Sequence, residues 1–126
     1  MAKYNILQEK SFAFAVRAVN LYKHLAEQKK EFILSKQILR SGTSIGANVE
    51  EGIGAQSDRD FMAKMSVSYK EARETIYWLR LLAATDYITK DEETSMLNDA
   101  EEICKILAKI ILATKQKLTP PPSFNY

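Results

Sequence analysis

The stretch RSGTSIGANVEEG, residues 40–52, lies within a helical hydrophobic pattern, yet it is crowded with glycine, serine and threonine. Each glycine inside a helix costs about 1 kcal/mol relative to alanine. Gly42 and Gly46 are four residues apart, so they lie one above the other beside an apolar stripe formed by Ile38, Ile45 and Val49. Small residues at this spacing let two backbones approach closely. The stretch therefore predicts a helix that crosses a neighbour at short distance.

A second stripe of this helix is entirely polar and consists of Gln37, Ser41, Ser44, Asn48 and Glu51. One interpretation is a solvated face. The other is a half-buried seam in which Ser44 and Asn48 meet polar groups of the next helix, such as Ser68 and Glu71. Buried polar groups need partners, so such a seam sets the register between helices or subunits. Gly52 and Gly54 are suited to end the helix.

A periodicity of 3.6 residues runs through four segments, at about 8–29, 35–53, 58–86 and 90–118. The last two segments open with capping signatures, Ser57 with Asp60 and Thr89 with Glu92. The connections are short, so neighbouring helices are expected to run antiparallel. The sequence thus predicts an all-α protein, an antiparallel up-down four-helix bundle over residues 1–118, followed by a proline-rich tail at 119–126.

The first helical segment carries two apolar stripes, whereas a helix of an isolated bundle needs only one. One stripe is Phe12, Ala15, Val19, Tyr22 and Ala26, and the other is Phe14, Ala18, Leu21 and Leu25. The third segment also has apolar residues outside its main stripe. A monomer rarely leaves so large an apolar patch in water. We therefore predict a homo-oligomer, with a subunit interface that includes Phe14, Leu21, Leu25, Val67, Trp78 and Leu81.

The bulk properties describe a single domain of 126 residues with a net charge of only +2. No apolar run approaches the roughly 20 residues that a membrane span needs. The first residues lack the apolar stretch of a signal peptide. One cysteine permits no disulfide within the chain. We expect a cytoplasmic protein with no membrane partner.

Residues that could support catalysis or hold a metal are scarce. The one histidine, His24, has no Glu or Asp three residues before it, as a carboxylate-bridged di-iron bundle requires. Zinc sites need more histidine and cysteine than the chain contains. Cys104 falls on the apolar face of the last segment, which is typical of a core thiol. The sequence predicts no metal, no cofactor and no enzymatic activity.

The stretch SKQILRSGTSIGANVEEG, followed by Ser57, Phe61 and the SYKE of 68–71, resembles the bacterial 23S rRNA intervening-sequence protein family. The resemblance covers about residues 8–118. It is most specific at Gln37, Arg40, Ser41, Ser44, Ile45, Asn48, Glu51, Gly52, Ser68 and Glu71. It implies a bundle that assembles into a ring, a homopentamer, in which these residues serve packing and register. The family is similar to the accessory protein of diversity-generating retroelements, a pentamer that binds nucleic acid and a reverse transcriptase.

Basic residues follow one polar arc of the first segment. Lys10, Arg17 and His24 recur every seven residues, and Lys3 precedes them. In a ring such a strip repeats by symmetry and becomes a multivalent surface for phosphate. Association with RNA or DNA through this strip is one hypothesis. A protein-interaction scaffold that binds no nucleic acid is the alternative. The lysines between residues 105 and 117 also suit the C-terminal turns of a helix.

Overall fold

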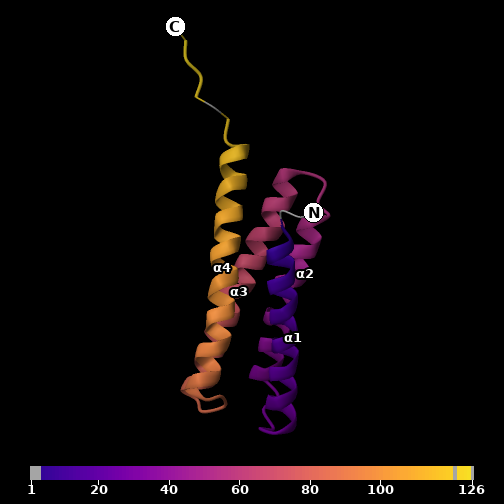
Figure 1. The fold of residues 1–126 in the computed structure, drawn as a ribbon, viewed down its shortest axis with the longest axis vertical. Helices are drawn as coiled ribbons and strands as arrows, with labels where there is room; N and C mark the ends of the chain where they lie inside the picture. Colours follow the sequence, from indigo (N-terminus) through magenta and orange to yellow (C-terminus); the bar gives the residue numbers. More distant parts are fainter. Residues whose placement is uncertain (1–3, 121, 126) are drawn as a thin grey trace.

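The computed structural model describes residues 4–120 and 122–125, which form four helices and, within these residues, no strand. The helices are α1 (Asn5–Glu27), α2 (Leu34–Ile53), α3 (Asp58–Ala84) and α4 (Lys90–Leu118). Successive helices run in opposite directions, and α1 begins at the end of the bundle where α4 terminates (Figure 1). The predicted all-α up-down four-helix bundle is confirmed.

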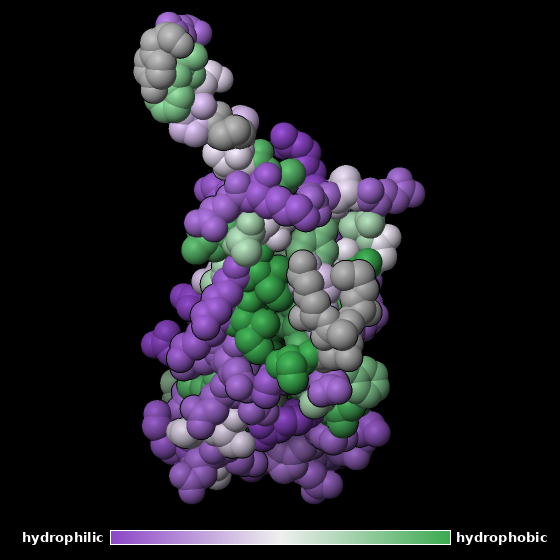
Figure 2. Space-filling model, turned by 45° about the horizontal axis from the view of Figure 1, so that its top comes forward, coloured by the Kyte–Doolittle hydropathy of each residue, from purple (hydrophilic) through white to green (hydrophobic). Residues whose placement is uncertain are grey.

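Helices that follow one another in the chain pack together extensively, whereas α1 and α4, which close the bundle, contact each other much less. Large side chains from all four helices fill the core, among them Phe14, Ile45, Met65, Leu79 and Leu107. Apolar side chains are visible between α4 and α1 near the end where α4 terminates (Figure 2). The bundle is therefore tight along three edges and more open along the fourth.

Gly42 and Gly46 mark the close crossing of α1 and α2 that their spacing predicts. A Cβ atom on Gly42 would lie 2.6 Å from the Cβ of Ala18, and one on Gly46 would lie 3.4 Å from the carbonyl oxygen of Ser11. The first distance is far inside van der Waals contact, so only glycine fits at this crossing. Close packing of α1 offsets the helix propensity that glycine forfeits.

Buried polar groups join α2 to α3. The hydroxyl groups of Ser41 and Thr75 hydrogen-bond at 2.9 Å, and Ser68 donates to the carbonyl oxygen of Ile45 at 2.8 Å. All three side chains that carry these hydroxyls are fully buried. A buried polar seam is thus present between α2 and α3, with Ser41 as its member from the predicted stripe, and it fixes the register of α3 against α2.

Two members of the predicted seam do not take part in it. Ser44 donates to the carbonyl oxygen of Arg40 at 2.7 Å, and Asn48 donates to that of Ser44 at 2.8 Å. The expected contacts of these two side chains with Ser68 and Glu71 were wrong. Each side chain finds an acceptor one turn back in its own helix, and that local bond competes with a bond across the interface.

The helix starts show one capping group that the sequence analysis missed. Ser57 and Thr89 cap α3 and α4 as predicted, and Glu92 completes the capping box at Thr89. At α2 the cap is Glu31, whose carboxylate accepts from the backbone N–H groups of Ile33, Leu34 and Ser35 at 3.2, 3.0 and 2.7 Å. Burial raises the pKa of Glu31, but these N–H groups outweigh it and hold the pKa below its usual value.

Candidate self-association and nucleic-acid surfaces

The two apolar stripes of α1 lie on different sides of the helix. Phe14 and Leu25 are 1% and 0% exposed, so they belong to the core of their own chain. Their predicted place at a subunit interface was wrong, because α2 and α4 flank the side of α1 on which they lie. Leu21 packs against the same core and is partly buried. The surface side of α1 carries Phe12, which is 72% exposed, and Val16.

Phe12 stands beside a shallow groove between α1 and α2. The groove has a volume of about 230 Å³, and its small lining residues include Ala15, Thr43, Gly46 and Ala47. We refer to Phe12, Ala15, Val16, Thr43 and Ala47 as the α1/α2 face. The face combines an exposed aromatic ring with an adjacent shallow hollow.

A second outward surface lies between α2 and α3. The Arg40 guanidinium pairs with Glu71 at 2.9 Å and with Glu74, and the Trp78 indole N–H donates to Glu74 at 2.8 Å. Lys64 of α3 also pairs with Glu51 of α2, at 2.9 Å. The resemblance places several of these charged residues in its motif, and here they connect α2 to α3.

Apolar side chains lie among these ion pairs. Val67 is 43% exposed, and Trp78 and Leu81 are partly buried. We refer to Arg40, Val67, Glu74, Trp78 and Leu81 as the α2/α3 face. The prediction that Val67, Trp78 and Leu81 lie away from the main core stripe of α3 agrees with this exposure. Their role at a subunit interface stays a prediction.

The basic strip predicted on α1 is largely neutralised by α4. Lys10 pairs with Glu102 at 3.0 Å, and Arg17 pairs with Asp99 at 2.6 Å and also bonds to Ser95. His24 lies in a groove that it shares with Asp91 and Glu92. Lys3 lies outside the described residues. Phosphate would have to displace acidic partners here, so the strip is a poor anion-binding surface.

His24 also meets an acidic helix start. The backbone N–H of Thr89 does most to lower the pKa of Glu92, and the neighbouring His24 lowers it further. A carboxylate that stays ionised next to His24 attracts cations rather than phosphate.

Exposed cations without an ion pair among the described residues also occur on α3 and α4, as they do at Lys23, Lys29, Lys30, Lys36 and Arg59. The α3/α4 face consists of Lys70, Arg73, Arg80, Lys105, Lys109 and Lys115, all of them exposed. None of the six forms an ion pair within residues 4–120 and 122–125. Arg73 and Lys105 line one groove together with Tyr69 and Glu101, so the two helices contribute to a common surface. The sequence analysis counted the α4 lysines but did not place the α3 cations beside them.

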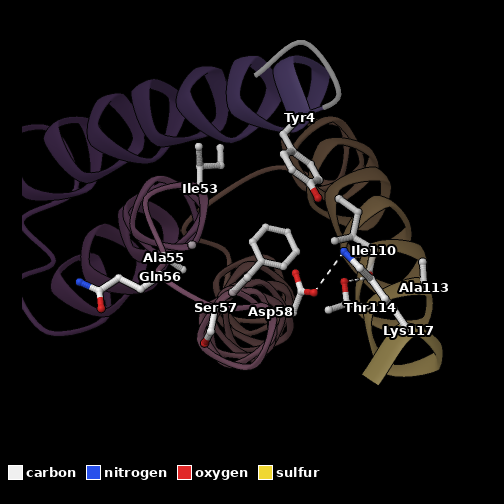
Figure 3. A pocket seen from close by; sticks show the side chains of 12 residues that line it. Tyr4, Ile53, Ala55, Gln56, Ser57, Asp58, Ile110, Ala113, Thr114 and Lys117 are labelled. Atoms are coloured by element: carbon white, nitrogen blue, oxygen red, sulfur yellow. Dashed lines mark hydrogen bonds and ion pairs between the residues drawn. The ribbon is translucent and has the colours of Figure 1, made fainter. Parts of the chain in front are cut away.

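A cavity near one end of the bundle shows no arrangement for chemistry. It has a volume of about 510 Å³ and lies between Tyr4, which precedes α1, the end of α2 with the following loop, the start of α3 and the last turns of α4 (Figure 3). The rings of Tyr4 and Phe61 line it with their centroids 5.1 Å apart, together with Ile110. Lys117 and Asp58 pair with each other at 3.1 Å across its rim, and the Thr114 hydroxyl donates to the Ile110 carbonyl oxygen. These polar groups are therefore already engaged.

The remaining candidates for chemistry are equally poor among the described residues. No group of three or more His, Cys, Asp or Glu is placed to hold a metal ion in the part of the chain that the structure describes. Cys104 is buried, as predicted, and burial raises the pKa of its thiol, which disfavours the nucleophilic thiolate. Within the same residues no helix is both long and apolar enough to cross a bilayer.

The fold and its surfaces define a class of protein: a small four-helix bundle whose distinguishing features are on its outer faces rather than in a pocket. The chain belongs to the 23S rRNA-intervening sequence protein family, whose model matches residues 3–109. This confirms the resemblance noted in residues 35–52.

A solved structure shows the same fold. It is a protein of unknown function from the S23 ribosomal protein family of Bacteroides thetaiotaomicron VPI-5482. It is 55% identical to this chain, covers 87% of this chain and 98% of its own, and superposes with a TM-score of 0.86. No curated protein matches the chain.

Proposed function

We propose that this protein is a non-catalytic homo-oligomer of the cytoplasm, assembled as a ring that the family resemblance puts at five copies. The single observation that supports self-association best is the α1/α2 face, with Phe12 72% exposed beside an apolar hollow. Burying a large apolar side chain contributes about 1.5–3 kcal/mol to the stability of an assembly. In a symmetric oligomer the same face of every copy is buried by a neighbouring copy.

Light scattering on a sizing column at micromolar protein tests the proposal. The wild type is expected to elute with the mass of several 14.3 kDa chains. Phe12→Asp is expected to reduce this mass, because a carboxylate cannot be buried unpaired in an apolar contact. Leu112→Asp is the matched control, since Leu112 is 57% exposed but lies on α4, away from the α1/α2 face. A wild-type monomer at this concentration would contradict the proposal.

A second candidate function is association with RNA or DNA, and the α3/α4 face favours it. Arg73 and Lys105 line one groove with Glu101 and form no ion pair among the described residues, so they suit a phosphate backbone better than the paired strip on α1 does. Repetition of this face around an oligomer would strengthen a weak contact by multivalency. Binding of this type is independent of sequence and falls with salt.

Anisotropy of a labelled single-stranded RNA of mixed sequence measures this association. Charge reversal by Arg73→Glu with Lys105→Glu is expected to abolish binding and to reduce the slope of log K against log salt. Lys10→Gln with Arg17→Gln is the control, and it is expected to leave binding nearly unchanged. No binding by the wild type at low salt would favour the protein-interaction scaffold.

A further inference from the structure

The turn between α1 and α2, residues 28–33, exposes two consecutive apolar side chains. Ile33 is 75% exposed and Phe32 is 54% exposed. The turn lies at the end of the bundle opposite to the C-terminal tail (Figure 1). Because these side chains belong to a connection and not to the core, they can enter a neighbouring surface while the four helices keep their packing.

Lysines flank the two apolar side chains. Lys29 and Lys30 precede them, Lys36 follows in the first turn of α2, and all three are exposed. None of the three forms an ion pair within residues 4–120 and 122–125. The nearest exposed acid along the chain is Glu27, the last residue of α1. Lysine can hold its charge in a polar layer while its methylene groups lie along an apolar one.

The one acid of the turn itself is directed inward. Glu31 is 9% exposed, and its carboxylate accepts the backbone N–H groups of residues 33–35. The residue before it, Lys30, has a left-handed backbone with a φ of 54°. The turn therefore presents cations and apolar side chains to the outside, whereas its carboxylate serves inside the fold as the cap of α2.

Other acids at this end of the bundle belong to the turn between α3 and α4. Glu92 is engaged there in the capping box, which lowers its pKa most, and the nearby charges of His24 and Lys29 lower it further. Asp86 and Asp91 are exposed. An anionic surface would therefore be approached through the α1–α2 turn, with the α3–α4 turn tilted away from it.

The chemistry of the α1–α2 turn fits an anionic lipid surface better than a nucleic acid or a folded protein. A bilayer surface offers phosphate groups above hydrocarbon, which matches lysines beside an apolar pair. The more exposed member of that pair, Ile33, is aliphatic and cannot stack on a base as an aromatic ring does. Lysine is also depleted at protein–protein interfaces.

We propose that the α1–α2 turn is a docking site for an anionic lipid surface. Phe32 and Ile33 enter the boundary between headgroups and acyl chains, and Lys29, Lys30 and Lys36 contact the lipid phosphates. The expected absence of a membrane partner rests on the lack of an apolar run long enough to span a bilayer, but a contact at headgroup depth needs no span. Docking of this kind requires neither self-association nor binding of nucleic acid.

Flotation of the full-length protein with vesicles tests this docking. The wild type is expected to float with an equal mixture of phosphatidylcholine and phosphatidylglycerol, and much less with phosphatidylcholine alone. Phe32→Ser with Ile33→Ser is expected to abolish flotation. Lys29→Gln with Lys30→Asn is expected to weaken it about 30-fold, since each lysine near an anionic surface contributes about a factor of five. Asparagine tolerates the left-handed backbone at position 30.

Matched controls change the same residue types elsewhere on the surface. Leu112→Ser removes an apolar side chain that is 57% exposed on α4, and Lys105→Gln with Lys109→Gln removes two exposed cations of the same helix. Both are expected to leave flotation nearly unchanged. Circular dichroism of each variant reports whether the bundle is folded.

The depth of the contact is measured with the fluorophore NBD on a single cysteine. In a Cys104→Ser background, the label on Ile33→Cys is expected to shift its emission to the blue when the mixed vesicles are added, whereas the label on Leu112→Cys is expected to stay unchanged. A wild type that does not float with the mixed vesicles at low salt would overturn the proposal. Flotation that both turn variants retain would overturn it as well.

The same labelled chain distinguishes the other possible ligands of the turn. A response of the label at position 33 to single-stranded RNA, with none to the vesicles, would assign the turn to nucleic acid and overturn the lipid proposal. Light scattering reports self-association separately. A monomeric wild type that floats would contradict the proposed oligomer and still support docking through the turn, and an oligomer that does not float would do the reverse.

Discussion

Phe12 and Phe14 are two residues apart on α1, yet they meet opposite environments. Phe14 is 1% exposed and packs in the core, whereas Phe12 is 72% exposed beside the α1/α2 groove. Two residues turn a helix by about 200°, so both rings cannot face one core. The comparison teaches that an apolar pattern in the sequence does not by itself show which of its residues enter the core of their own chain.

Truncation of these two rings gives the largest expected contrast. Phe14→Ala is expected to lower the free energy of unfolding by about 3–5 kcal/mol, because it leaves a cavity among close-packed side chains. Phe12→Ala in dilute protein is expected to change it by less than about 0.5 kcal/mol. Urea unfolding followed by circular dichroism measures both. Equal losses would show that Phe12 also packs within its own chain.

The inner side of α1 can be disturbed from α2 as well. Gly42→Ala would place a methyl group 2.6 Å from the Cβ of Ala18. Separating the helices to relieve this clash is expected to cost about 1–3 kcal/mol of unfolding free energy. Gly54→Ala is the control, because its nearest atoms are 3.8 Å away and its φ is −84°, which any residue adopts. Thermal unfolding that ranks the two substitutions in the reverse order would contradict the close crossing.

The Glu31 carboxylate, in the turn between α1 and α2, caps the start of α2. The contribution of this cap to stability therefore depends on pH. Glu31→Gln is expected to cost about 1 kcal/mol at neutral pH, as loss of a cap does. The pKa of Glu31 is lowered in the folded chain, so the stabilisation is present above the unfolded pKa and is lost as pH falls through the folded pKa.

Urea unfolding of the wild type and of Glu31→Gln as a function of pH measures this difference. The two curves are expected to converge in acid, where the wild-type carboxyl is protonated. If the difference in unfolding free energy stays constant from neutral to acidic pH, the negative charge of Glu31 does not contribute to the cap.

The smallest effect is expected at the edge of α1 that faces α4. Lys10→Gln breaks an exposed pair with Glu102 and is expected to cost about 0.2–1 kcal/mol, less at high salt. Lys105→Gln, on the α3/α4 face, removes no pair and is expected to change stability less. Chemical denaturation at two salt concentrations distinguishes them. A salt-independent loss at Lys10 would indicate a packing role for its methylene chain.

Local patterns predicted much of the fold because their physics is local. The start of α4 follows from Thr89 and Glu92, which bond to each other's backbone within one turn. The close crossing at Gly42 was predictable because glycine is unfavourable inside a helix, so its presence there indicates a close neighbour. The cap at Glu31 was not predictable in this way, because its side chain reaches N–H groups of residues that follow an irregular turn.

The candidate surfaces were predicted less well. A heptad repeat of Lys10, Arg17 and His24 looks like an anion-binding strip until α4 is placed beside it. Asp99 and Glu102 are more than 80 residues away in the chain, and no local signal pairs them with α1. The α3/α4 face is the converse case, since Arg73 and Lys105 come together only when the two helices pack.

The sequence by itself determined that there are four amphipathic helices, how two of them are capped, where one crosses its neighbour closely, and to which family the chain belongs. These properties depend on residues within a few turns of one another. Only the tertiary structure decided which stripe of α1 became the core, which cations kept acidic partners, and which apolar side chains stayed in water. Those outcomes depend on the rotation of each helix against its neighbours, and that rotation is settled by the packing of all four helices together.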